Sequence, residues 1–166
     1  MQNKVHGVYM DTDSTPIGDF VRLRAWVFAH MLWNPTRDPL KLTEEFARGY
    51  YGLAGPQVLS YLQLTHNAVK RSGMKLHYAN ADTSFFSLDE MNEATRLWDQ
   101  AEAAVAGDAT LRVRVRRDRL PFDQAWLQNW ARLKRTAERK GLEFLGPNDV
   151  TAAVSPSVDS PSTVPA

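Results

Sequence analysis

The sequence predicts a mainly α-helical protein, an array of about five or six helices preceded by one short strand. Two observations carry this prediction. Apolar residues recur at helical spacing through most of residues 20–140, and helix start and stop signals divide this range into separate helices. Residues 5–9, with Val5, Val8 and Tyr9 around Gly7, have the pattern of a short strand.

The strand predicted at residues 5–9 has no partner strand elsewhere in the sequence. A lone strand cannot satisfy its own backbone N–H and C=O groups, so it is interpreted as the last piece of a larger sheet or barrel. The chain is therefore predicted to be the C-terminal fragment of a bigger protein. Residues 1–35 would be the terminal β/α unit of the truncated barrel, 36–150 a helical domain, and 151–166 a disordered tail rich in Ser, Pro and Val.

The first predicted helix begins at Gly18 or Asp19 and runs to about Trp33. Its second half is apolar nearly all round, which is typical of a helix buried on two sides. We interpret it as sandwiched between the missing sheet and the helices that follow. Asn34-Pro35 ends it, because the residue before a proline avoids helical geometry.

Capping signals predict the later helices. Asp38-Pro39 begins a helix that ends near Tyr51, with Gly52 as its C-cap, and a third helix spans residues 56–72. Ser87-Leu-Asp-Glu90 is a capping box, and it opens a helix with a clear apolar face: Leu88, Met91, Thr95, Trp98, Ala101 and Val105.

The last predicted helix follows Gly107-Asp108 and covers residues 109–140. Pro121 is expected to kink or break it, since proline lacks the N–H for one helical hydrogen bond. The alternation of arginine and valine over residues 111–115 also allows a short strand there. After the proline, one apolar stripe continues the helix: Phe122, Trp126, Trp130, Leu133 and Ala137.

Composition excludes several classes of function. With 20 Lys+Arg against 19 Asp+Glu, the net charge of +1 creates no field that would attract nucleic acid or an anionic membrane, and we expect neither as a partner. The absence of cysteine excludes disulfides, thiolate metal sites and a cysteine nucleophile, and we expect no cofactor. The first ten residues lack the apolar run of about 7–15 residues found in signal peptides, although a longer protein would carry its signal upstream.

Residues 20–52 carry a family resemblance. The helix FVRLRAWVFAHMLWNP, followed by EEFARGYYG and an Ala-x-Pro helix start, resembles the C-terminal part of the bacterial family called domain of unknown function 4838. Its members resemble glycoside hydrolases with a TIM-barrel core. The resemblance, which covers about residues 5–133, implies that the strand is the last one of that barrel. It also implies a carbohydrate substrate for the full-length protein, and a fragment that is not catalytic alone.

Tyr9, Asp11 and Asp13 are the candidate substrate-binding residues. The C-terminal end of a barrel strand faces the active site, and residues i and i+2 point the same way, about 6.6 Å apart. Glycosidases use two carboxylates about 5–9.5 Å apart. Asp11 and Asp13 could therefore bind sugar hydroxyls or act in catalysis. The alternative is that both are turn formers that accept hydrogen bonds from nearby backbone N–H groups.

The other candidates favour structural roles. The four histidines lack zinc-ligand spacing, and His30 and His66 are expected to be core or interface residues. The aromatic residues Trp26, Trp33, Tyr50 and Tyr51 could stack on sugars but are expected in the core. The basic run 112–119 could contact nucleic acid, although a solvated helix face is favoured.

Two further functions stay open: a self-contained helical interaction module, and a nucleic-acid-binding helical domain that uses the basic run 112–119. The barrel-facing side of residues 23–33 is expected to be exposed when the chain is alone, and to cause self-association.

Overall fold

The computed structural model describes residues 19–75 and 82–147, and it is mainly helical, as the sequence predicts. The strand predicted at residues 5–9 and the tail at 151–166 lie outside the described residues, and the domain boundaries at 35 and 150 stay predictions. Within the described ranges the elements are α1 (Val21–Trp33), α2 (Pro39–Tyr51), the 3-10 turn η1 (Gly52–Ala54), α3 (Gly55–Ser72), α4 (Leu88–Ala104) and α5 (Ala109–Lys140).

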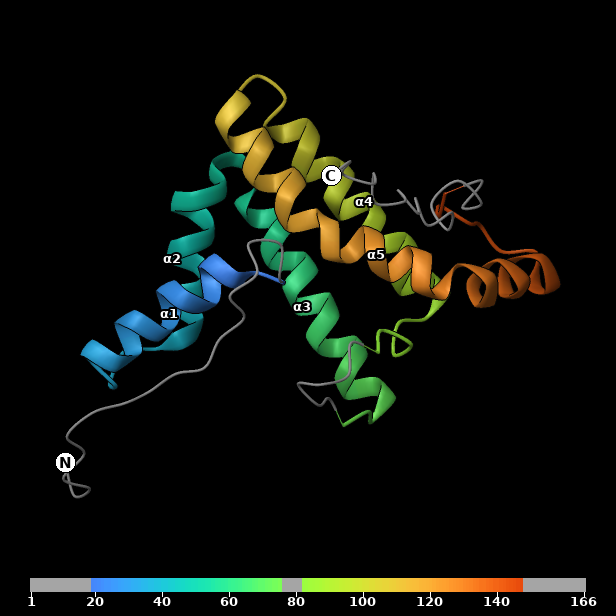
Figure 1. Ribbon diagram of the computed structural model, residues 1–166, viewed down its shortest axis with the longest axis horizontal. Coiled ribbons are helices and arrows are strands. Elements are labelled where there is room, and N and C mark those ends of the chain that lie inside the picture. The colour runs from blue at the N-terminus through green and yellow to red at the C-terminus, as the bar shows by residue number, and fades with distance from the viewer. Residues whose placement is uncertain (1–18, 76–81, 148–166) are drawn as a thin grey trace, which may run out of the picture.

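The helices form an angular array in which each packs on the next (Figure 1). α1 and α2 lie side by side at one end, α3 packs against both α2 and α4, and α5 runs along α4 and also contacts α2. α1 therefore lies at the edge of the array, with α2 as its main helical neighbour.

Capping residues begin the helices where the sequence predicts. The Asp38 carboxylate accepts a hydrogen bond from the Leu40 N–H at 2.9 Å, and Pro39 takes the first turn of α2. Ser87 and Glu90 form both bonds of the capping box at the start of α4. The Asp108 carboxylate accepts from two N–H groups at the start of α5. Each cap contributes about 1 kcal/mol.

α5 continues through Pro121, so a break at the proline and a strand at residues 111–115 are both wrong, whereas the kink expected as the alternative stays a prediction. Proline removes one helical hydrogen bond, but Val115 and Phe122 on either side of it are buried in the same core at 0% and 1% exposure. Burial of these two side chains offsets the proline, which costs about 3 kcal/mol in a helix interior through the missing bond and the clash of its ring with the preceding turn.

One aromatic cluster joins the start of α1 to α3, α4 and α5. The Trp98 ring lies 5.0 Å from that of Tyr61 and 6.3 Å from that of Phe20, and the Tyr61 ring lies 5.7 Å from that of Phe122. Phe20 has φ 48°, a left-handed conformation that costs a non-glycine residue about 1–2 kcal/mol. Its ring is 4% exposed, so burial offsets this strain and fixes where α1 begins.

Glycine allows α2 and α3 to approach closely after the motif Gly49-Tyr-Tyr-Gly52. A Cβ atom on Gly55 would lie 2.9 Å from the backbone oxygen of Ala47 in α2. No side-chain movement relieves a contact with backbone. The short spacing between the motif and Gly55 is therefore part of how α3 folds back along α2.

α1 differs from its prediction as a helix buried on two sides. Leu23 is its one buried side chain, whereas Phe28, Leu32 and Trp33 are 40%, 54% and 91% exposed. The reason is its edge position, because α2 covers one side of α1 and no other helix of the described part packs closely on the opposite side. The exposure expected within residues 23–33 is found at Phe28, Leu32 and Trp33, and that this side faces a barrel stays a prediction.

Candidate functional site

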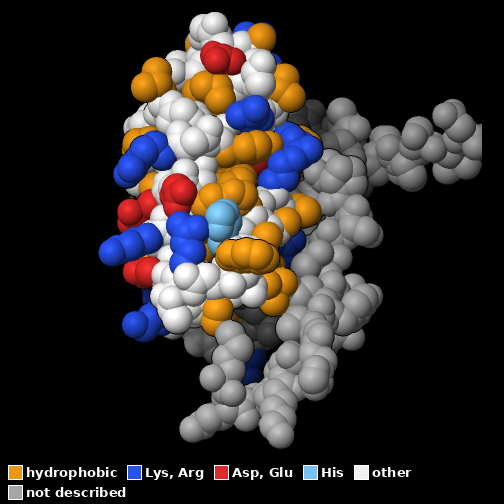
Figure 2. Space-filling model, turned by 90° about the vertical axis from the view of Figure 1, so that its left-hand side faces the viewer, with side chains coloured by type: hydrophobic (Ala, Val, Ile, Leu, Met, Phe, Trp, Pro, Cys, Tyr) orange, Lys and Arg blue, Asp and Glu red, His pale blue; other side chains and the backbone are white. Residues whose placement is uncertain are grey.

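The predicted substrate-binding residues Tyr9, Asp11 and Asp13 lie outside the described residues, so their role stays a prediction. The site that the structure does describe is the surface around α1. We call the exposed side chains Phe28, Leu32, Trp33 and Leu40 the apolar face. Figure 2 looks onto this side of the molecule and shows hydrophobic side chains gathered there among charged ones.

A mostly apolar groove of about 620 Å³ continues the apolar face between α1, α2 and α3. Leu23, Val27 and Phe28 from α1 line one wall, and Leu40, Leu59 and Leu62 line the others. Arg24 and Glu44 stand among its polar residues. We call this the α1 groove. Phe28 and Leu40 belong both to this groove and to the apolar face.

A second groove, of about 860 Å³, lies between α3 and α5, and we call it the α3–α5 groove. Asp19 and Phe20 line both grooves. Its apolar lining includes Tyr61, Phe85 and Phe86, and its polar lining includes Lys70, Gln124 and Gln128. The volume lies in the range of ligand-binding pockets, roughly 300–1,000 Å³.

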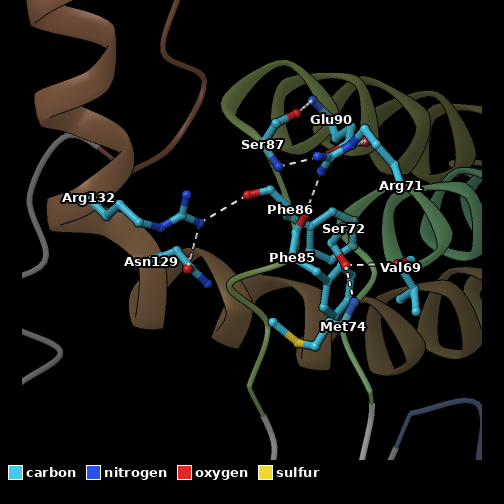
Figure 3. A network of polar contacts seen from close by, with 10 residues as sticks. All are labelled: Val69, Arg71, Ser72, Met74, Phe85, Phe86, Ser87, Glu90, Asn129 and Arg132. Atoms are coloured by element: carbon cyan, nitrogen blue, oxygen red, sulfur yellow. Dashed lines mark hydrogen bonds and ion pairs between the residues drawn. The ribbon is translucent and has the colours of Figure 1, made fainter.

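Two arginines from different helices fix the loop that lines the α3–α5 groove (Figure 3). Arg71 of α3 donates to the carbonyl oxygen of Phe85 at 2.6 Å and makes two bonds of 2.8 Å to Glu90. Arg132 of α5 donates to the carbonyl oxygen of Phe86 at 3.0 Å. The pKa of Glu90 is lowered overall. Desolvation by burial acts to raise it, but the hydrogen bonds from Arg71 and Ser87 outweigh that effect. The groove is therefore largely preformed.

The motif Gly49-Tyr-Tyr-Gly52 serves packing. Tyr51 is fully buried, and its hydroxyl donates to the Asp118 carboxylate of α5 at 2.6 Å. Burial and the Asp118 charge raise the pKa of Tyr51 far above its usual value, so the phenol stays protonated and keeps donating. Tyr50 accepts from Arg117 at 2.7 Å. The expected core role of Tyr51 is confirmed, and Tyr50 is half-buried beside it.

Trp26 and Trp33 differ from each other. Trp26 is half-buried, with its ring 5.7 Å from that of Phe46, which fits the expected packing role. Trp33 is 91% exposed at the end of α1, so the expectation of a core position for it is wrong. The apolar sequence around Trp33 did not indicate that this end of α1 is exposed.

The basic run 112–119 is largely paired with groups of the same chain. Arg116 contacts Glu102 at 3.0 Å, and Arg119 contacts Asp99, Glu102 and Asp123 at 2.7–3.1 Å. Arg114 donates to the Tyr50 carbonyl oxygen and stacks 4.5 Å over its ring. These contacts favour the structural interpretation, because paired guanidinium groups have less charge to offer to phosphates.

The histidines of the described part do not form a metal site. His30 is half-buried, with Nδ1 2.8 Å from an Arg37 nitrogen and its ring 4.2 Å from that of Trp26. His66 is exposed and lines both grooves, so it is not a core residue, and the interface role expected as the alternative stays a prediction. Residues 19–75 and 82–147 contain no group of three or more His, Cys, Asp or Glu side chains that could hold a metal ion.

Several residues that line a groove or hold the surrounding helices and loop in place were not identified from the sequence. Tyr61 has the spacing of the buried face of α3 and could have been assigned to it from that spacing. Asp118, Arg71 and Arg132 look like ordinary surface residues of amphipathic helices, because their partners lie 14 to 67 residues away in sequence.

Among the described residues, no helix combines the length and the hydrophobicity that a membrane span requires.

These observations define a mainly helical protein with an exposed apolar face. Residues 1–63 match the model of the family described as Domain of unknown function (DUF4838). The match supports the resemblance found in the sequence as far as residue 63, and its extension to about residue 133 stays a prediction. No curated protein and no solved structure matches the chain.

The family match and the apolar face occupy the same part of the chain. The matched residues include all of α1 and α2 and the first half of α3. They contain the whole apolar face and every residue that lines the α1 groove except His66. The α3–α5 groove, in contrast, takes most of its lining from residues beyond 63.

Proposed function

We propose that this chain is the C-terminal helical portion of a carbohydrate-active, glycoside-hydrolase-like protein and has no catalytic activity alone. The supporting observation is the coincidence of the apolar face and the α1 groove with the family-matched residues. In this proposal the apolar face packs against the barrel of the full-length protein. The strand at residues 5–9 would be the last barrel strand, and its exit, with Tyr9, Asp11 and Asp13, would contact the carbohydrate.

The experiment compares the chain with the product of the complete reading frame. Both are assayed with a panel of p-nitrophenyl glycosides. Hydrolysis by the complete protein and none by the 166-residue chain supports the proposal. A reading frame that starts at Met1, or a complete protein that neither binds nor cleaves any glycoside, contradicts it. Substitution of Asp11 and Asp13 by Asn in the complete protein then tests whether either carboxylate contributes.

A self-contained helical interaction module is the alternative, and the same exposed face supports it. Leu32 and Trp33 are large, apolar and more than half exposed at 54% and 91%. A lone chain that covers this face does so with a second copy or with another protein. In this alternative the face is the working surface of the protein, and no barrel is needed.

The isolated chain is expected to self-associate through the apolar face. Sedimentation velocity from about 5 to 200 μM should show a concentration-dependent shift to larger species. Leu32→Glu/Trp33→Glu should return the protein to a monomer, because charge on this face is costly to bury. Val113→Glu is the matched control, since Val113 is 63% exposed on α5 and should leave association unchanged. A monodisperse wild-type monomer at all concentrations would argue against this role for the face.

A further inference from the structure

The α3–α5 groove has the dimensions of a short extended chain. Its α3 wall includes residues from Tyr61 to Lys70, nine helical steps or about 13 Å. About four residues of extended polypeptide span the same length. The arginine pair at the Phe85–Phe86 loop holds one end of the groove in place, so a ligand would meet a preformed surface.

The same molecule already holds one extended segment against its helices. Asn92, 4% exposed on α4, donates to the Glu143 carbonyl oxygen at 2.8 Å and accepts from the Leu145 N–H at 3.0 Å. One side-chain amide thus pairs with backbone groups two residues apart. Between them the Phe144 ring packs 5.3 Å from Trp126, and Glu143 forms an ion pair with Arg96. An amide, an apolar lining and a cation together bind an acidic-aromatic segment.

The α3–α5 groove offers the same three groups. Gln124 and Gln128 stand one helical turn apart on α5, about 6 Å along the axis, close to the two-residue repeat of about 6.6 Å in an extended chain. The Gln124 amide makes no hydrogen bond within the described residues. Gln128 Oε1 accepts from Thr83 at 2.9 Å, which leaves its NH₂ group to donate. Phe20, Phe85 and Phe86 supply the apolar lining.

Charge indicates which segment fits. Lys70 of the α3 wall is exposed and makes no ion pair within the described residues. Asp82, at the loop end, accepts a bond from the Ser84 N–H, and its pKa is lowered chiefly by that bond. Asp19, whose charge acts on Tyr61, lines the groove as well. An acidic ligand side chain is therefore favoured beside Lys70 and disfavoured beside Asp82 and Asp19. We therefore expect the acidic residue of the ligand to be the neighbour of its aromatic residue, as Glu143 is the neighbour of Phe144 in this chain.

We propose that the α3–α5 groove binds an extended peptide segment with an acidic residue next to an aromatic residue. The aromatic side chain lies on Phe85 and Phe86, the acidic one meets Lys70, and Gln124 pairs with the peptide backbone. The site depends neither on the apolar face nor on a catalytic role. It can therefore be tested on the 166-residue chain, and its test can succeed or fail independently of the function proposed above.

The test is fluorescence polarisation with a labelled, end-blocked peptide, Gly-Ser-Glu-Phe-Ser-Leu-Gly, and the full chain. We expect a dissociation constant below about 1 mM, and amide shifts in ¹⁵N spectra confined to residues of α3, α5 and the 82–87 loop. Gln124→Leu should weaken binding about 2- to 10-fold, the loss of one backbone pairing. Gln100→Leu, an exposed glutamine on α4 away from the groove, is the matched control and should bind as wild type.

A charge exchange makes the test specific. Lys70→Glu should weaken the Glu-Phe peptide about 2- to 5-fold, and a Lys-Phe peptide should bind this variant better than it binds the wild type. Lys140→Glu, on the exposed end of α5, should change neither affinity. Absence of binding at 1 mM peptide overturns the proposal. Equal affinity for a Ser-Ser peptide, or saturation by maltotriose in place of peptide, does so as well.

Discussion

Replacing Trp98 by alanine is expected to lower the free energy of unfolding by about 3–5 kcal/mol. Trp98 is 1% exposed on α4, and its ring contacts those of Tyr61 and Phe20. Its removal leaves a cavity where the start of α1, α3 and α4 meet. Surrounding helices can only partly collapse into that cavity. Urea unfolding followed by far-ultraviolet circular dichroism measures the change.

Trp33→Ala is the control for this prediction, since it removes the same side chain from a position that is 91% exposed. A surface substitution of this kind should change the free energy of unfolding by no more than about 0.5 kcal/mol. At a protein concentration where the chain is a monomer, equal losses for the two variants would mean that Trp33 is covered within the chain, and the edge position of α1 would then be wrong. The Leu32→Glu/Trp33→Glu variant tests self-association, whereas Trp98→Ala and Trp33→Ala test the stability of the fold. The two effects are therefore measured separately.

Local signals predicted the helices well because caps act over three or four residues. Ser87 and Glu90, or Asp38 with Pro39, satisfy N–H groups that belong to their own first turn. Such signals can be found in the sequence without knowing what packs nearby. The bounds of α2, α3 and α5 agree with the sequence prediction within about one residue, which is the usual uncertainty of helix ends.

The partners of α1 could not be predicted in the same way. An apolar sequence such as Trp26–Trp33 indicates that a helix is buried, but it does not indicate which element covers it. In the structure α2 covers part of it, and Phe28, Leu32 and Trp33 stay exposed. The Arg/Val alternation over residues 111–115 failed for a related reason. Arg114 of this stretch contacts Tyr50 on α2, and the neighbouring Arg116 pairs with Glu102 on α4, partners that only the folded chain brings near.

The grooves depend on contacts between residues distant in sequence, so they were beyond sequence reasoning. Arg71 and Arg132 come from different helices and meet at the Phe85–Phe86 loop. The family motif was a better guide to architecture than to chemistry. Its Tyr51 is buried at the contact between α2 and α5, where no substrate can reach its hydroxyl.

Asp118→Ala is expected to destabilise the protein by about 3 kcal/mol. Asp118 is 7% exposed, accepts from Tyr51 at 2.6 Å, and lies 3.1 Å from Arg117. Alanine would leave a buried phenol without an acceptor and a half-buried guanidinium without its counter-ion. A bond to a charged group is worth about 1.5–3 kcal/mol, and an uncompensated charge adds to that loss. Asp118→Asn keeps an acceptor oxygen, so it should cost less than alanine.

A double-mutant cycle with Tyr51→Phe isolates the bond itself. Tyr51→Phe alone should cost about 1.5–3 kcal/mol, the worth of a hydrogen bond to a carboxylate. Once Asp118 is alanine, the same Tyr51→Phe change should cost almost nothing, or even stabilise, because the phenol no longer has an acceptor to lose. Additive losses in urea unfolding would mean that the Tyr51–Asp118 bond does not link α2 to α5 in solution. The family motif would then have to hold the array through packing alone.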